Sequence, residues 1–205
     1  MTIQWLRHGE TALNAARVVQ PADTPLSPRG LAQAAAAARR LASAGAAALL
    51  SSDLPRAHQT AEAVAAATGL PLQFEPLLRE RNFGDWRGRA HDSLGFDLTD
   101  IPDKPPNGES LAEFLARVAQ AWQAVCARRA ALGGPLIVVS HGLVIRAVLE
   151  HHAHRAHDGA PVLPPRMANT SLSIIEADAP HRLLLADCTR HLDADNGADR
   201  TLGSV

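Results

Sequence analysis

The chain has 205 residues, of which 46% are hydrophobic and 20% are charged, as in soluble globular proteins. This length suits one domain with a sizeable core and is short for two. The formal net charge is −1 and no basic stripe with interleaved aromatic residues is present, so nucleic acid is not an expected partner.

Apolar stretches along the chain are interrupted by polar or charged residues, so we expect no membrane-spanning segment and a cytoplasmic location. The two cysteines, Cys126 and Cys188, are far apart in the sequence and form no C-x-x-C pair. We expect both to be reduced thiols.

Short apolar runs alternate with helical stretches along most of the chain. We expect strands at 3–6, 47–50, 72–74, 136–139, 171–176 and 183–187, and helices at 28–44, 55–68, 110–132 and 143–150. This alternation predicts an α/β fold, a three-layer α/β/α sandwich with a mostly parallel central sheet. The last two strands are close enough in sequence to add an antiparallel edge.

Residues 79–109 are rich in glycine and proline and predict a long, loop-rich excursion over the site. An excursion of this length in a compact domain is usually functional or disordered. We expect one catalytic domain over residues 1–192, which includes this excursion. The polar residues 193–205 predict a frayed C-terminal tail.

Two expected strands end in the same signature, a histidine followed by a glycine. The first strand leads into Arg7-His8-Gly9 and the fourth into Ser140-His141-Gly142. Glycine after each histidine permits a sharp turn and close backbone approach. Because ligands of parallel sheets bind outside the carboxyl ends of the strands, we expect both histidines to face one crevice.

A third strand leads into a segment that places Arg56 in the first turn of a helix. A cation there opposes the helix dipole, which is unfavourable unless an anion is bound. Taken singly, a histidine at a strand end is more often structural and such an arginine usually lies on the surface. The combination at three strand ends predicts a phosphate-binding crevice.

The segment Arg7-His8-Gly9-Glu10-Thr11, followed by Asn14, resembles the signature of the histidine phosphatase superfamily, the phosphoglycerate-mutase-like proteins. Further blocks match in family order. They are 23–27 with Gly30, 51–61, 78–86, 108–110 and 138–142, and together the resemblance covers residues 3 to 192.

The resemblance implies a role for each matching residue. His8 would attack phosphorus and become phosphohistidine, and Glu80 would be the general acid and base. The remaining expected site residues hold the phosphoryl oxygens or the substrate: Arg7, Asn14, Gln20, Arg56, His141 and Gly142.

These roles make physical demands on the residues. Most catalysis of phosphoryl transfer is positioning plus charge stabilisation, and an arginine fork supplies two parallel donors to a phosphate. His8 must present an unprotonated nitrogen, so we expect Arg7 and Arg56 to keep it neutral and a backbone carbonyl to fix its tautomer. Glu80 must carry a proton to the leaving group, and an approaching phosphate dianion favours that form.

The reaction indicated is hydrolysis of small-molecule phosphomonoesters, with phosphoglycerate mutase as the nearest alternative. Mutases of this family usually carry a longer excursion with paired arginines, whereas here Arg87 and Arg89 are not adjacent. This favours a phosphatase. A protein phosphatase and a non-catalytic phosphate-binding module are further alternatives. The natural substrate stays open among sugar phosphates, nucleotide-derived phosphates, phosphoglycerates and α-ribazole phosphate, and Arg87, Arg89 and His91 are candidates for its selection.

A second group of histidines, within 150–158, could share a helix face and bind a metal, but a solvent-facing helix end is the favoured interpretation. The expected mechanism uses neither a metal nor a cofactor. The expected partner is a small phosphorylated metabolite. The oligomeric state is left open, with a homodimer among the options.

Overall fold

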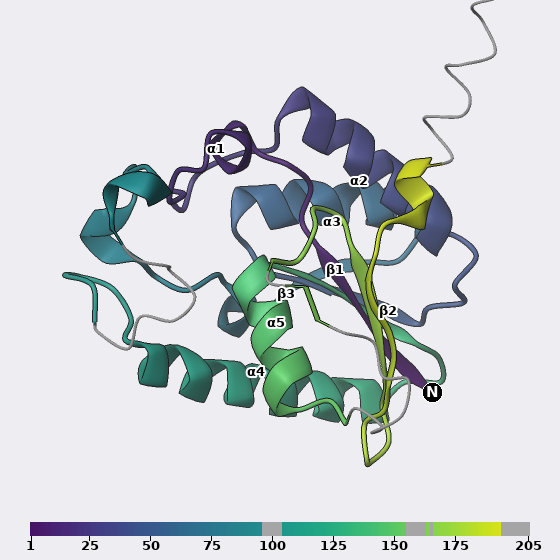
Figure 1. The fold of residues 1–205 in the computed structure, drawn as a ribbon. Coiled ribbons are helices and arrows are strands. Elements are labelled where there is room, and N and C mark those ends of the chain that lie inside the picture. Colours follow the sequence, from purple (N-terminus) through teal and green to yellow (C-terminus); the bar gives the residue numbers. More distant parts are fainter. Residues whose placement is uncertain (96–103, 155–162, 165, 194–205) are drawn as a thin grey trace, which may run out of the picture.

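A computed structural model describes residues 1–95, 104–154, 163–164 and 166–193 of the protein (Figure 1). Its strands form one six-stranded sheet in the order β3-β2-β4-β1-β5-β6. The strands are β1 Thr2–Arg7, β2 Ala48–Ser51, β3 Leu72–Phe74, β4 Leu136–Ser140, β5 Leu172–Glu176 and β6 Leu183–Cys188. The α-helices are α1 Ala12–Ala15, α2 Pro28–Leu41, α3 Pro55–Thr68, α4 Leu111–Ala130 and α5 Gly142–His151.

The centre of the sheet is parallel, and one antiparallel strand lies between it and the edge strand β6. Strand β1 pairs in parallel with β4, with Trp5 opposite Val138, and β4 pairs in parallel with β2. Strand β5 runs antiparallel to both β1 and β6. Every residue of β4 is buried, as expected for a fully apolar strand covered on both faces.

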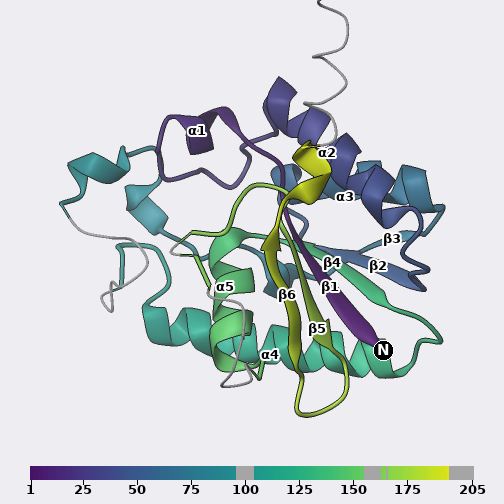
Figure 2. The same ribbon diagram turned by 45° about the vertical axis from the view of Figure 1, so that its right-hand side comes forward.

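Helices cover both faces of the sheet, which gives the predicted three-layer sandwich (Figures 1 and 2). Because side chains alternate along a strand, Leu136 and Val138 pack toward α4 and α5. Ile137 and Val139 pack toward α2 and α3 in a separate core. The α2–α3 core is rich in alanine, whose small side chain allows close helix–sheet packing.

The ends of the predicted elements lie within about two residues of those observed, apart from three larger differences. The helix predicted at 28–44 ends at Leu41, because residues 42–44 form a turn in which the Ala44 N–H is bonded to the Leu41 carbonyl at 3.0 Å. The four-residue helix α1 was not predicted. The excursion contains two short 3₁₀ helices, Gly84–Trp86 and His91–Ser93, and a further one, Pro76–Leu78, precedes it.

The excursion is attached to the segment that follows α1. The Val19 N–H donates to the Arg89 carbonyl at 2.9 Å, and the His91 N–H donates to the Arg17 carbonyl at 2.8 Å. A Cβ at Gly84 would lie 1.9 Å from the Pro106 carbonyl oxygen, so the two ends of the excursion are in backbone contact. This arrangement places the excursion beside the carboxyl ends of β1 and β4.

Several predictions concern residues that the structure does not describe. Residues 96–103 of the excursion and all of the predicted tail except Asp193 lie outside the described residues. The division into a domain at 1–192 and a tail stays a prediction. Within the described residues, no helix is both long and apolar enough to cross a membrane. Cys126 and Cys188 are free thiols.

Candidate active site

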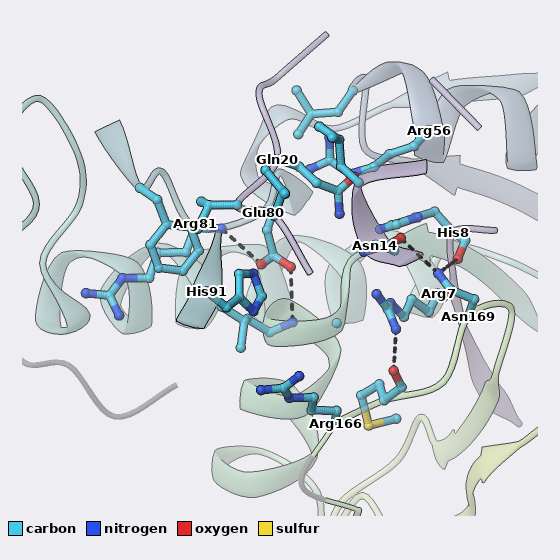
Figure 3. Close-up of a pocket in the computed structure, with 18 of the residues that line it drawn as sticks. Arg7, His8, Asn14, Gln20, Arg56, Glu80, Arg81, His91, Arg166 and Asn169 are labelled. Atoms are coloured by element: carbon cyan, nitrogen blue, oxygen red, sulfur yellow. Dashed lines mark hydrogen bonds between the residues drawn. The ribbon is translucent and has the colours of Figure 1, made fainter. Parts of the chain in front are cut away.

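A pocket of about 270 Å³ opens at the carboxyl ends of β1 and β4, under the excursion (Figure 3). Seven of the predicted site residues line it: Arg7, His8, Asn14, Gln20, Arg56, Glu80 and Gly142. The eighth, His141, is fully buried and lies behind the pocket wall. The sheet topology therefore brings together residues from five segments of the chain.

His8 is 2% exposed and sits in the turn after β1. Its Nδ1 lies 2.6 Å from the carbonyl oxygen of Gly9. A carbonyl can only accept, so Nδ1 carries the proton and Nε2 carries the lone pair. The pKa of His8 lies well below its usual range, first because of burial and then because of the charges of Arg7 and Arg56. The sequence predicted only the effect of the two arginines on this pKa, whereas burial lowers it more than they do.

His141 stands next to His8, with 5.2 Å between the ring centroids. Its Nε2 lies 2.8 Å from the Ser52 hydroxyl oxygen, which also accepts the Leu54 N–H at 3.3 Å. The hydroxyl proton of Ser52 can therefore go to Nε2, and this leaves the proton of the neutral ring on Nδ1. His141 Nδ1 has no hydrogen-bond partner among the described residues, so it can donate to an anion.

The pKa of His141 is also well below its usual range. Burial is the main cause, followed by the charge of Arg56 and then by those of His8 and Arg7. A neutral ring can still donate one hydrogen bond from Nδ1 to a phosphoryl oxygen.

Arg56 is buried and Arg7 is partly buried, and the Nε atom of each is buried with no hydrogen-bond partner among the described residues. Arg7 donates from Nη1 to the Met167 carbonyl, and Arg56 Nη1 lies 3.4 Å from the Pro21 carbonyl oxygen. Burial lowers the pKa of Arg56 to about 10, which leaves it protonated at neutral pH. Buried donors without partners are costly, so a bound anion would stabilise both side chains.

Glu80 is held by two backbone N–H groups. Oε1 accepts the Arg81 N–H at 3.0 Å, and Oε2 accepts the Leu143 N–H at 3.2 Å (Figure 3). Leu143 lies in the first turn of α5, where N–H groups have no partner within the helix. The carboxylate therefore has a fixed position beside the helix terminus that follows His141.

Two amides add donors to the pocket. Asn14 Oδ1 accepts the Thr11 N–H at 3.3 Å and the Asn169 side-chain amide at 3.3 Å. Gln20 Oε1 accepts the Thr11 hydroxyl at 2.8 Å. Because the oxygens of Asn14 and Gln20 are occupied, their NH₂ groups are the parts that can donate to a bound anion.

Sequence reasoning missed residues that position the predicted ones. Asn169 donates to the His8 carbonyl at 3.2 Å, and Thr60 accepts the Gly9 N–H at 3.0 Å. Asn169 precedes β5, and its place beside His8 follows from the pairing of β5 with β1. Thr60, Ser52 and Leu143 lie in or next to the blocks that match the family. No pattern in those blocks indicated their contacts.

In the second histidine group, His151 and His154 are exposed and His152 is partly buried. His152 stacks on Trp122, with ring centroids 5.7 Å apart, and the pKa of His152 is lowered mainly by burial. Among the described residues, no three histidine, cysteine or acidic side chains are grouped as metal ligands would be. His157 and Asp158 lie outside the described residues.

Several known proteins resemble this chain in sequence and in fold. A probable phosphoglycerate mutase GpmB of Yersinia pestis is 36% identical over 163 residues, 73% of each chain. A mycobacterial glucosyl-3-phosphoglycerate phosphatase solved with VO3 is 30% identical, with a TM-score of 0.75 over 90% of this chain and 97% of its own. Bacillus stearothermophilus YhfR is 30% identical, with a TM-score of 0.79 over 93% and 98%. The sequence profile of the histidine phosphatase superfamily (branch 1) matches residues 3–186, and the chain belongs to this family.

Proposed function

We propose that the protein is a phosphatase that hydrolyses small-molecule phosphomonoesters through a phosphohistidine on His8. The observation that carries this proposal is the state of the His8 ring, which is neutral and has its Nε2 lone pair available. Beside it lie Arg7 and Arg56, whose buried Nε groups have no partner among the described residues. A nucleophile next to donors for phosphoryl oxygens is what phosphoryl transfer requires. The size of the pocket, about 270 Å³, suits a small phosphorylated metabolite as partner.

In the first step, His8 Nε2 attacks phosphorus while the bond to the leaving oxygen breaks. Arg7, Arg56, His141 Nδ1 and the amides of Asn14 and Gln20 bind the phosphoryl oxygens, and Gly142 lies against the Arg7 side chain. Glu80 gives its proton to the leaving oxygen. The phosphorylated ring is a cation with its remaining proton on Nδ1, and the Gly9 carbonyl stabilises that N–H.

In the second step, a water molecule attacks the phosphorus of phosphohistidine. The Glu80 carboxylate takes a proton from this water, the bond between phosphorus and Nε2 breaks, and inorganic phosphate leaves. His8 returns to its neutral form with the proton on Nδ1, and Glu80 is again protonated. The cycle uses no metal and no cofactor.

A phosphoglycerate mutase is the second candidate, and the 36% identity to a probable enzyme of that activity favours it. Against it, no two arginines of the excursion are adjacent, and Arg87 and Arg89 are separated by Gly88. The relative solved as a glucosyl-3-phosphoglycerate phosphatase supports hydrolysis. We therefore propose hydrolysis as the main activity, in the cytoplasm.

Two assays test this choice. Phosphate release from a generic aryl phosphate measures hydrolysis, and conversion of 3- to 2-phosphoglycerate measures mutase activity. We expect fast release in the presence of a chelator and none from the His8→Ala variant. Rapid interconversion with negligible hydrolysis would establish the mutase instead, and hydrolysis of phosphopeptides alone would point to a protein phosphatase. Phosphate binding without either activity would identify a non-catalytic module.

A further inference from the structure

The pocket contains more positive charge than a phosphoryl group needs. Among the described residues, its lining includes a single carboxylate, Glu80, and seven arginines: Arg7, Arg17, Arg56, Arg81, Arg87, Arg146 and Arg166. A phosphate dianion bound between Arg7 and Arg56 balances two of these charges. Five arginines remain on the outer walls of the pocket.

Three of these five are engaged by groups of the protein itself. The engaged pairs are Arg17 with Asp92 at 3.1 Å, Arg146 with Glu150 at 2.7 Å, and Arg81 with the Glu109 carbonyl at 3.2 Å. The Arg81 guanidinium also lies over the Phe83 ring, 5.4 Å from its centroid. These contacts assign a structural role to each of the three.

Arg87 and Arg166 differ from the other outer arginines. Neither side chain makes a hydrogen bond or an ion pair with the described part of the chain. Arg87 belongs to the excursion and is close enough to Arg56 that its charge lowers the pKa of Arg56. Arg166 comes from the segment before β5 and is exposed, and its neighbour Met167 accepts a hydrogen bond from Arg7.

The positions of these arginines relative to Glu80 decide what they can contact. In an in-line displacement, the leaving oxygen departs on the side opposite the attacking Nε2, so the alcohol part of the substrate lies at Glu80 and beyond. In Figure 3, His91 lies on the side of Glu80 that faces away from His8, and Arg166 lies below both. Because Arg166 lines the same pocket as Glu80, its side chain is accessible to the alcohol part of the substrate.

We propose that the alcohol part of the substrate carries a second anionic group, a carboxylate or a further phosphate, which Arg87 and Arg166 bind. This inference rests on the proposed function, because it assumes that the phosphoryl group occupies the site at His8. The planar guanidinium fork suits either group, and neither fork has a carboxylate partner within the described part of the chain.

Matched substrates that differ in one anionic group test the proposal. The pairs are 3-phosphoglycerate with glycerol 3-phosphate, 4-carboxyphenyl phosphate with 4-carbamoylphenyl phosphate, and propane-1,3-diol bisphosphate with propyl phosphate. For at least one pair, we expect the wild-type kcat/KM to be about tenfold or more higher for the member with the additional charge, as for one well-formed ion pair. The first two pairs report a carboxylate site and the third a phosphate site.

The double variant Arg87→Met/Arg166→Met should lower this ratio at least fivefold. Arg89→Met is the matched control, because Arg89 is exposed on the same excursion and does not line the pocket, so the ratio should persist. A wild-type ratio near one for all pairs, or a ratio that the double variant retains, would overturn the inference. If the wild type hydrolyses none of the six compounds, the proposed function itself fails.

Discussion

The carboxylate of Glu80 accepts the backbone N–H of Leu143 at 3.2 Å, and this bond joins the excursion to the first turn of α5. The same turn begins directly after His141, whose ring lies beside His8. One short helix terminus thus sets the position of the acid relative to the nucleophile. This position matters because a general acid must lie within hydrogen-bond distance of the leaving oxygen.

Glu80→Gln should affect substrates according to their leaving groups. Proton donation matters for an alkoxide and little for 4-nitrophenolate, which leaves without a proton. We expect kcat/KM to fall about 10²- to 10⁴-fold for an alkyl phosphate and less than tenfold for 4-nitrophenyl phosphate. The kcat/KM values are the relevant measurement, because they report phosphoryl transfer to the enzyme and not its later hydrolysis. An equal loss for both substrates would show that Glu80 does not act as the acid.

Both buried histidines should carry their proton on Nδ1. His8 donates from Nδ1 to the Gly9 carbonyl, and His141 Nε2 lies 2.8 Å from the Ser52 hydroxyl oxygen, which can donate to it. Nitrogen-15 NMR of histidine-labelled protein should show two neutral rings with unprotonated Nε2 atoms. Ser52→Ala should change the His141 signals and leave those of His8 in place. A protonated Nε2 on His141 in the wild type would remove its proposed donor to phosphate.

Stability should fall as the pH drops below 6.5, in buffers without phosphate. The folded-state pKa of His8 and of His141 lies well below the ordinary value of 6.5, so below pH 6.5 the unfolded chain binds protons that the folded chain does not. Each ring then costs up to about 1.4 kcal/mol of unfolding free energy per pH unit. The free energy of unfolding is therefore highest, with respect to these two rings, above pH 6.5, and it decreases as the pH falls from 6.5 toward the folded-state pKa.

Urea unfolding of wild type and His8→Gln at pH 6.5 and 5.5 measures this effect. The variant cannot protonate at residue 8, so its free energy of unfolding should fall by about 1 kcal/mol less than that of the wild type over this interval. Equal decreases in the two proteins would mean that His8 has an ordinary pKa when folded.

Gly30→Ala should destabilise the protein although alanine is the better helix former. Residue 30 lies in the first turn of α2, where alanine gains up to about 1 kcal/mol over glycine. A Cβ there would lie 2.0 Å from the Glu10 carbonyl oxygen, and overpacking of this kind costs about 1–3 kcal/mol or more. Gly133→Ala is the control, because nothing lies within 4 Å of its Cβ position. Thermal unfolding that leaves both variants unchanged would contradict the contact between α2 and the loop after His8.

The elements that sequence reasoning placed well have strong local signals. Helix α3 was predicted at both ends, because Pro55 suits the first helical position and Gly69 is a typical helix end. In the structure, Gly69 adopts φ 72° at that end. The short helix α1 has no room for an apolar repeat, and its only local signal is the reciprocal capping of Thr11 and Asn14. The attachment of the excursion to residues 17–19 depends on tertiary contacts that leave no local pattern.

In the site, too, some residues have a local sequence signal and others do not. The strand ends, with the glycines after the two histidines, were sufficient to place His8 and Arg56 at one pocket and His141 next to His8. The groups that fix tautomers and orientations come from backbone atoms or from distant segments, as with Leu143 and Asn169. Burial is the first cause of the lowered pKa of His8, and it could be recognised only in the packed fold. The charges of the neighbouring arginines could be predicted from the sequence.

Trapping of the phosphorylated enzyme tests the central claim most directly. Brief incubation with a ³²P-labelled monoester, followed by alkaline quench and peptide mapping, should give an acid-labile, base-stable label on His8, attached at Nε2. The His8→Ala variant should give no label, and the label should disappear at a rate no slower than phosphate release. A wild-type enzyme that turns over without a labelled His8, or that carries the phosphoryl group on another residue, would contradict the account.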